Sequence, residues 1–510
     1  MKNEGRGVRS ERTVGGGNAP RCLFVILMMS AVVGFMCATA QAQYVLQYHA
    51  TADHSANYVI PNLTPERAHL MHLDQTFDGR VNGHVYAQPL LTPTPAARHE
   101  LLLVATENNV VDALDASTGK LIWQKFVGQP VPLSMLPCGN INPLGITGTP
   151  VINTPRAAIY LDAMVMTQAG PQHLAFGLSV KSGQVLPGFP VNVAQKLAAL
   201  GMHFTPTYQN QRGALLIMQN TLYIPYGGHD GDCGRYHGWV VGIGLDDPHP
   251  TIAWSTQAAR GGIWAPGGTV SDGQSLFVAT GNTSNASQWE DGEAVIRFDP
   301  DLKAPAGSID YFAPSNWSTL DAYDKDLGGT NPVVLNLGAS HLILALGKDA
   351  NAYLLDRDNL GGIGGALAVE EVSSKSIITA PAVYPGPNGG AFVAFHGLGS
   401  KCPGTISHPS LIVLKVLAQP TPAISTAWCG SLNGAGAPIV TTSDGSANPI
   451  VWMVGAGGDD QLHAFRGDNG QPLLTGSQPT MQGLRPFATI VATPERLYVP
   501  ADGRIYAFTQ

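Results

Sequence analysis

The side chains best suited to metal binding or proton transfer are concentrated in one short stretch of the chain. His229, Cys233 and His237 recur there every four residues, and Asp230 and Asp232 stand between the first two. Imidazole and thiolate are common ligands of transition metals, so this spacing makes the stretch a candidate transition-metal site. Histidine is also a frequent general acid or base, which leaves a metal-free enzymatic role open.

A repeated hairpin pattern predicts the strands that would position this stretch. In Glu107 to Trp123, two apolar runs are joined by a polar turn that contains Gly119, and weaker copies occur at Ala175 to Leu186 and at His463 to Leu473. Such a turn suits two antiparallel strands. Repetition of one supersecondary unit along the chain predicts a solenoid or a propeller.

A second marker gives the number of units. A residue pair ending in proline precedes an apolar run seven times, and Phe487-Ala488 is an eighth copy without proline. The seven pairs are Gln88-Pro89, Thr149-Pro150, Thr205-Pro206, Ala265-Pro266, Asn331-Pro332, Ala380-Pro381 and Ala437-Pro438. Proline is tolerated at the first residue of a strand. We therefore predict an all-β fold, an eight-bladed β-propeller of four-stranded antiparallel blades over residues 43–510.

The details of the blades can be predicted less directly. In the third unit we expect strands near Thr207 to Gln209, Leu222 to Tyr226, Trp239 to Leu245 and Thr251 to Thr256. The last unit lacks an outer strand, and we expect the N-terminal segment around Tyr44 to Tyr48 to supply it and close the ring. Only Ala194 to Met202 has a helical pattern.

The N-terminus has the pattern of a secretory signal peptide, which we assign to residues 1–42. Four arginines precede an apolar run from Leu23 to Cys37, and two small-x-small cleavage sites follow. A lipoprotein anchored through Cys37 is a weaker alternative. The run is too short for a stable membrane span, so we expect a protein exported to the periplasm or beyond.

Charge and cysteine content narrow the partners. Without residues 1–42 the chain carries 23 basic and 34 acidic residues, a net charge of −11, which argues against nucleic acid as a partner. Four cysteines remain, Cys138, Cys233, Cys402 and Cys429, and an even number in an exported chain favours disulfides in one of three connectivities. We expect a monomer.

The repeat ALDASTGKLIW resembles that of the pyrroloquinoline quinone (PQQ) propellers, the quinoprotein alcohol dehydrogenases and their relatives. The segment Gly261 to Ser287 looks like the family segment that holds the quinone-stacking tryptophan and a Ca²⁺-binding asparagine. The resemblance assigns these roles to Trp264 and Asn282, and both are chemically suitable. Either residue could instead be structural, as a channel plug or a turn residue.

Two later segments carry the remaining family positions. Asp321 to Leu335 resembles the segment with the catalytic base, which implies that role for Asp326, with Asp324 two residues before it and Asn331 as a cofactor contact. Gly347 to Arg357 resembles the strand pair whose cation contacts the quinone, which implies that role for Lys348. An aspartate-rich turn and a solvated lysine are the structural alternatives.

The chain also departs from the family pattern. Adjacent cysteines that cover the quinone in the family are reduced to Cys138, and an acidic Ca²⁺ ligand is replaced by Cys233, with Asp232 beside it as the remaining candidate. The resemblance places Cys138 and Cys233 face to face, where a disulfide would shut or reshape the pocket. Cys402 and Cys429 then form the second pair.

Three functions remain open. The first is a PQQ- and Ca²⁺-dependent oxidoreductase of an alcohol, polyol or sugar, whose electrons would leave through a separate protein because the sequence has no Cys-x-x-Cys-His haem motif. The second is a non-catalytic scaffold that binds an envelope protein or a glycan. The third is another propeller enzyme, such as a polysaccharide lyase, that uses His229, Arg235 or His237.

Overall fold

In the computed structural model, the described residues are 44–93, 100–284, 286–303, 309–476 and 478–510. The expected signal peptide, residues 1–42, lies outside these ranges. Within them, no helix is long and apolar enough to cross a membrane.

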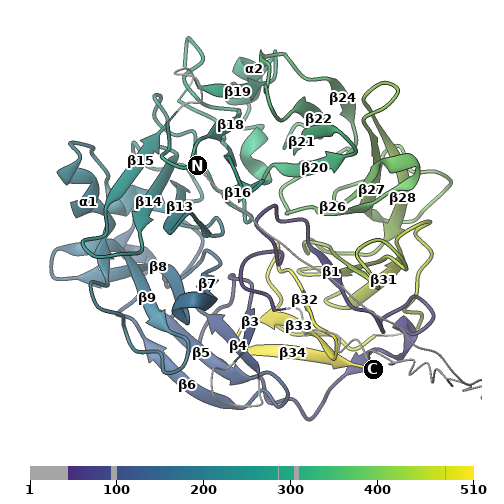
Figure 1. The fold of residues 1–510 in the computed structure, drawn as a ribbon, viewed down its shortest axis with the longest axis horizontal. Helices are drawn as coiled ribbons and strands as arrows, with labels where there is room; N and C mark the ends of the chain where they lie inside the picture. The colour runs from purple at the N-terminus through teal and green to yellow at the C-terminus, as the bar shows by residue number, and fades with distance from the viewer. Residues whose placement is uncertain (1–43, 94–99, 285, 304–308, 477) are drawn as a thin grey trace, which may run out of the picture. The chain divides into compact units, whose positions relative to one another are not determined.

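The strands form eight sheets around a central axis, and the fold is an eight-bladed β-propeller, as predicted (Figure 1). The first blade contains β3 (Leu90–Pro93), β4 (Glu100–Ala105), β5 (Val110–Asp115) and β6 (Leu121–Phe126), and the second contains β7 (Val151–Asn153), β8 (Ala158–Thr167), β9 (Gly170–Ser179) and β10 (Val191–Asn192). The third contains β11 (Gln209–Asn210), β12 (Leu216–Met218), β13 (Thr221–Gly228), β14 (Trp239–Gly244) and β15 (Thr251–Ser255). The fourth contains β16 (Val270–Ser271), β17 (Leu276–Ala279), β18 (Val295–Phe298), β19 (Asp310–Ala313) and β23 (Gly362–Ile363).

The other four blades include two strands from the N-terminal segment. The fifth blade contains β20 (Val333–Leu337), β21 (Ser340–Leu346), β22 (Asn351–Asp356) and β24 (Ala368–Glu371), and the sixth contains β25 (Ala382–Pro385), β26 (Ala391–His396), β27 (Pro409–Leu417) and β28 (Ala423–Ser431). The seventh contains β29 (Ile439–Thr442), β30 (Ile450–Val454), β31 (Leu462–Arg466) and β1 (Asn57–Val59). The eighth contains β32 (Val491–Ala492), β33 (Arg496–Ala501), β34 (Arg504–Thr509) and β2 (His72–Leu73). The sheets are antiparallel except where β1 joins β29 and β23 joins β19.

The repeated hairpin forms as predicted in the first blade. Every residue of β5 is buried, whereas β6 has exposed residues, so β5 lies inside the blade and β6 at its outer edge. The Oδ1 atom of Asp115 accepts hydrogen bonds from the backbone of Ser117 at 3.0 Å and of Thr118 at 2.9 Å. Gly119 then takes φ +71°, which glycine adopts without strain.

The proline markers predict the start of most inner strands but not that of the third blade. Pro206 begins a short 3-10 helix, Pro206–Tyr208, and the inner strand is β12, ten residues after the proline. Proline suits the first position of a helix as well as that of a strand, since its missing N–H costs nothing in either place. The other three strands of this blade lie where the sequence placed them.

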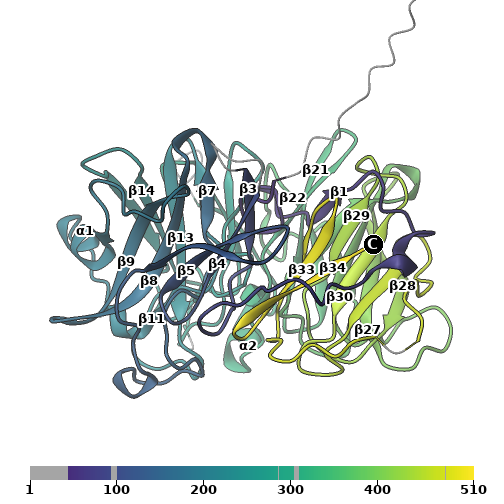
Figure 2. The same cartoon turned by 90° about the horizontal axis from the view of Figure 1, so that it is seen from below.

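Closure of the ring by the N-terminal segment is confirmed, but the expected strand is wrong. The outer strand of the last blade is β2, which pairs with β34, and not Tyr44 to Tyr48. Val45 instead pairs with Leu91 on the inner strand of the first blade. Val45 and Tyr48 are buried, and an outer strand would have left them partly in water. Figure 2 shows β1 beside β29 in the side view.

The described residues contain one more α-helix than the sequence indicated. α1 (Val193–Ala199) overlaps the predicted range, begins one residue before it and is capped by the Asn192 side chain. The second, α2 (Trp317–Ala322), was missed because six residues are too few for a helical period to be recognised. Short 3-10 helices in the described ranges include Ala68–Leu70, Leu133–Met135, Thr154–Arg156, Pro206–Tyr208, Leu327–Gly329 and Pro387–Gly389.

Candidate functional site

The loops at one face of the propeller enclose an open cavity of about 520 Å³. Its lining comes mostly from loops that enter the inner strands and from loops between the second and third strands of the blades. The lining residues are Tyr86, Asn140, Ile141, Asn210, Arg212, Gly228, His229, Asp230, Gly231, Asp232, Tyr236, Trp264, Asn282, Asp324, Asp326, Lys348, Ile378, Arg485, Pro486 and Phe487.

Most of the predicted site residues meet in this cavity. Those that line it are Asp232, His229, Trp264, Asn282, Asp324, Asp326 and Lys348. Asn331 does not: it is buried against Gly267, where an added Cβ would lie 2.1 Å from its Oδ1. Arg235 is exposed, His237 is half-buried, and neither residue lines the cavity.

Asp326 and Lys348 form the most buried ion pair of the cavity. Lys348 Nζ lies 2.5 Å from Asp326 Oδ2 and 3.0 Å from Asp324 Oδ1. The backbone N–H of Asn282 donates to Asp326 Oδ1 at 2.7 Å. Burial raises the pKa of Asp326, and the lysine opposes that rise. Burial lowers the pKa of Lys348, but the two carboxylates outweigh it, and the net shift is upward.

The indole of Trp264 lies beside this pair. Lys348 Nζ is 5.1 Å from the centroid of the indole ring, and the guanidinium of Arg212 is 5.6 Å from it. A Cβ on Gly281 would lie 2.7 Å from Asp326 Oδ1 and 3.2 Å from Trp264 Nε1. The absence of a side chain at position 281 therefore allows the carboxylate and the indole to approach each other.

Two buried carboxyl groups that the sequence did not single out bind the residues that follow Asp326 and Asn282 in the chain. Glu293 Oε2 accepts a hydrogen bond from the Leu327 backbone at 2.6 Å, and Asp321, on α2, accepts one from the Thr283 hydroxyl at 2.8 Å. Burial, reinforced by Asp326, raises the pKa of Glu293 well above its ordinary value. Glu293 is a single glutamate just before β18, and no sequence pattern around it indicates that it would bind the backbone next to Asp326.

The wall also contains residues from the first, third and last blades that the sequence analysis missed. The Arg212 guanidinium lies 4.3 Å from the centroid of Phe487, and that of Arg485 lies 5.4 Å from the centroid of Tyr86. Arg485 is paired with Asp502, whereas no carboxylate among the described residues lies within 4.0 Å of Arg212. These residues are far apart in the sequence, so no local motif could have predicted that they line the cavity.

Both predicted disulfides are present. Cys138 pairs with Cys233 and Cys402 with Cys429, at Cα distances of 6.0 Å and 5.7 Å. The first bridge joins two loops that line the cavity, and the cavity stays open. Of the two expected effects, closing the pocket or reshaping it, the bridge does not produce the first. Asp232, beside Cys233, accepts a hydrogen bond from Tyr236 at 2.5 Å.

The predicted transition-metal site does not form. The sulfur of Cys233 is bonded to Cys138 and cannot be a thiolate ligand. His229 Nε2 lies 3.1 Å from the Thr207 carbonyl oxygen, and His237 Nδ1 lies 2.9 Å from that of Thr256. Nowhere in the described ranges do three His, Cys, Asp or Glu side chains converge as metal ligands.

Comparison with known proteins identifies the fold. No protein-family model and no curated sequence matches the chain. Among solved structures it is similar to a quinohemoprotein alcohol dehydrogenase from Comamonas testosteroni (14% identity, TM-score 0.63, 92% of this chain and 80% of that one). It is also similar to the enzyme ADHIIG from Pseudomonas putida HK5 (12%, 0.63, 92% and 80%) and to a europium-containing methanol dehydrogenase (12%, 0.61, 92% and 98%). At these identities the likeness establishes the fold of the PQQ propellers and no more.

Proposed function

From this fold and from the lining of the cavity, we propose that the protein is an exported quinone-dependent oxidoreductase that converts an alcohol, polyol or sugar to a carbonyl compound. The observation that carries the proposal is the convergence of Trp264, Asn282, Asp326 and Lys348 on one open cavity. As isolated residues each has a structural explanation. A channel plug and a turn residue would not need to share a cavity with a buried carboxylate and its lysine partner.

The residues present fit a planar quinone with acidic groups. A volume of about 520 Å³ is in the range that binds cofactors of this size, and Trp264 offers an aromatic surface for stacking. The Arg212 guanidinium donates to the Trp264 carbonyl oxygen at 3.4 Å and has no carboxylate partner among the described residues. It therefore suits a cofactor carboxylate, and Lys348 suits a quinone oxygen. When bound, a quinone would supply the oxidant that takes hydride from the alcohol carbon.

Asp326 is the proposed general base. Its carboxylate is kept ionised by Lys348 and by the Asn282 N–H, while burial keeps its pKa above the ordinary value. A base of this kind can accept the hydroxyl proton as the carbon is oxidised. Asp324, whose side chain is largely exposed, gives the lysine a second carboxylate when Asp326 becomes neutral.

The residues do not fit calcium in this arrangement. Ca²⁺ takes six to eight oxygen ligands. Of the two predicted ligands, Asp232 binds Tyr236 and lies 3.7 Å from Arg260, which leaves the side-chain amide of Asn282. The nearby Asp326 already binds Lys348 and the Asn282 backbone, and Asp324 also binds Lys348. We therefore assign no step to a metal ion.

The two disulfides support export, and we propose that residues 1–42 are removed from a single propeller of residues 43–510. In that compartment the electrons would pass to a separate acceptor protein. Binding of an envelope protein or glycan is the alternative function if the cavity does not take a quinone.

Fluorescence titration with PQQ tests the proposal. We expect saturable quenching of tryptophan emission in the wild type and its loss in Trp264→Ala. Trp289→Phe is the matched control, because Trp289 stacks on Tyr311 at 3.6 Å and does not line the cavity. Asp326→Asn should bind PQQ but fail to oxidise alcohols with an artificial acceptor. A flat wild-type titration would reject the proposal and leave the scaffold alternative.

A further inference from the structure

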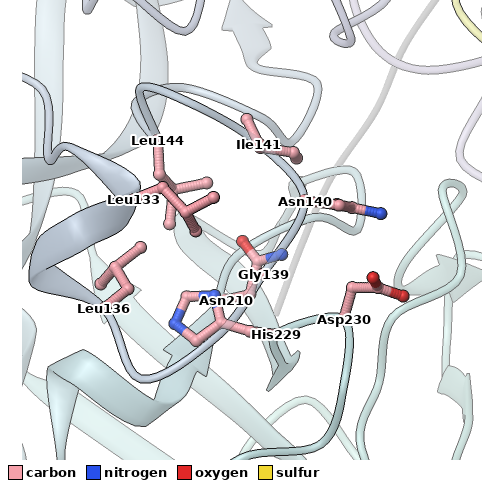
Figure 3. Close-up of a pocket in the computed structure, with 9 residues that line it drawn as sticks. All are labelled: Leu133, Leu136, Gly139, Asn140, Ile141, Leu144, Asn210, His229 and Asp230. Carbon is pink, nitrogen blue, oxygen red and sulfur yellow. The ribbon is translucent and has the colours of Figure 1, made fainter.

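A small side chamber, lined in part by Gly139, Asn140 and Ile141, lies next to the main cavity (Figure 3). Its volume of about 10 Å³ is enough for one water-sized group. Leu133, Leu136 and Leu144 contribute apolar walls, while Asn210 and His229 line both the chamber and the main cavity. A group bound to a ligand in the main cavity could therefore enter the chamber.

The protonation state of His229 follows from its surroundings. The ring is 4% exposed, and its Nε2 lies 3.1 Å from the carbonyl oxygen of Thr207. A carbonyl oxygen can only accept, so Nε2 carries the hydrogen. Burial lowers the pKa of His229 to about 4, which keeps the ring neutral at physiological pH. Nδ1 is then an acceptor with a free lone pair.

The Nδ1 atom of His229 lies close to Gly139. A Cβ at position 139, where φ is +131°, would be in van der Waals contact with Nδ1, at 3.9 Å. No hydrogen bond reaches this atom from the described part of the chain, and Figure 3 shows the imidazole among the side chains that line the chamber. The lone pair is therefore available to a ligand.

Asn210 provides a second unpaired acceptor. Its side chain is 9% exposed, and its Oδ1 is buried with no hydrogen-bond partner among the described residues. An amide oxygen also only accepts. These two acceptors lie beside leucine side chains, and the polar side chains of Asn140 and Asp230 also line the chamber. A hydroxyl group suits this lining, because it donates to an unpaired acceptor and can itself accept from an amide N–H.

We propose that the side chamber binds a hydroxyl group of the substrate through His229 Nδ1 and Asn210 Oδ1. The inference rests on the proposed function and narrows it: with one hydroxyl at Asp326 and another in the chamber, the substrate is a polyol or a sugar rather than a simple alcohol. A site that hydrogen-bonds a substrate hydroxyl discriminates strongly against an analogue that lacks it.

A panel of four-carbon alcohols tests this. Wild-type protein loaded with PQQ should have a kcat/KM at least about tenfold higher for one of 1,2-, 1,3- or 1,4-butanediol than for 1-butanol. In His229→Phe and Asn210→Leu this ratio should fall close to one. His237→Phe is the matched control, because that ring lies outside the cavity, and it should keep the ratio. Thermal unfolding of each variant shows whether it is folded.

The two proposals fail in different ways. If wild-type protein oxidises alcohols without preferring any diol, or if the variants keep the preference, the chamber holds water only and the inference is overturned while the oxidoreductase stands. If no alcohol is oxidised, the same panel is measured as binding to the unloaded protein by ligand-observed NMR. A diol preference that is lost in the two variants then supports the chamber, and its absence overturns it.

Discussion

Lys348 and Asp326 form a salt bridge of 2.5 Å in which the carboxylate is almost completely buried and the ammonium is 18% exposed. A buried charge that loses its partner is strongly destabilising, whereas removal of both charges is often nearly neutral.

We therefore expect Lys348→Met to lower the free energy of unfolding by about 3 kcal/mol, because Asp326 would remain as an unpaired buried carboxylate. Urea denaturation at pH 7 measures this. The double variant Lys348→Met/Asp326→Asn should recover most of the loss. Equal destabilisation of the single and double variants would show that the pair is not coupled.

Glu107, in the loop between the second and third strands of the first blade, should make stability depend on pH. Burial raises its pKa to about 7, and its Oε2 accepts a hydrogen bond from Gly145 at 2.7 Å. The folded protein therefore binds this proton more tightly than the unfolded chain, so the contribution is fully present below about pH 4.5 and is lost as the pH rises to about 7.

This pH dependence can be measured by comparing the unfolding free energies of wild type and Glu107→Gln. Relative to wild type, Glu107→Gln should gain about 3 kcal/mol of unfolding free energy between pH 4.5 and 7, because the glutamine has no proton to lose. Glu370→Gln is the control, since Glu370 is paired with Lys401 at the surface. Parallel pH profiles for wild type and Glu107→Gln would contradict the assignment.

The two disulfides should differ in their effect on the cavity. The Cys138–Cys233 bridge spans 95 residues and the Cys402–Cys429 bridge 27 residues. Replacing either pair by serine should cost a few kcal/mol, with about 1 kcal/mol more for the longer loop. Only loss of the first pair should weaken PQQ binding, because it joins two cavity loops. Equal weakening by both would point to a global effect.

Gly281 should not tolerate a side chain. The Cβ of Gly281→Ala would lie 2.7 Å from Asp326 Oδ1, so the carboxylate would have to move away from the Asn282 N–H. We expect about 1–3 kcal/mol of destabilisation and a reduced kcat. Crystallography of the variant would show the displaced carboxylate, and an unchanged Asp326 position with full activity would refute the argument.

The sequence predicts the repeated parts of the molecule well because each hairpin carries its own signal, a polar turn such as Ser117 to Gly119 between apolar runs. It fails where position depends on distant partners. Tyr44 to Tyr48 could be recognised as strand-forming, but the pairing of Val45 with Leu91 on the first blade is a long-range contact that no local pattern encodes. Pro206 shows that one local signal can start either a strand or a short helix.

The same contrast holds for the site. Trp264, Asn282, Asp326 and Lys348 could be identified because each lies in a segment that resembles a family motif. Three other residues of the site lie outside such segments. Glu293 matters because it is buried, Arg212 because it has no carboxylate partner among the described residues, and Asn210 because its buried Oδ1 accepts no hydrogen bond from them. The metal prediction at His229 to His237 failed because spacing alone does not show where each ring points.

The N-terminal strands β1 and β2 complete the last two blades, where they pair with residues 440–442 and 508–509. Contacts of such long sequence separation form late, after most of the loop entropy has been lost. A growing chain would carry β1 unpaired until β29 is made and β2 unpaired until β34 is made. A chain cut short within the last blade should therefore leave β2 open to pairing with other molecules.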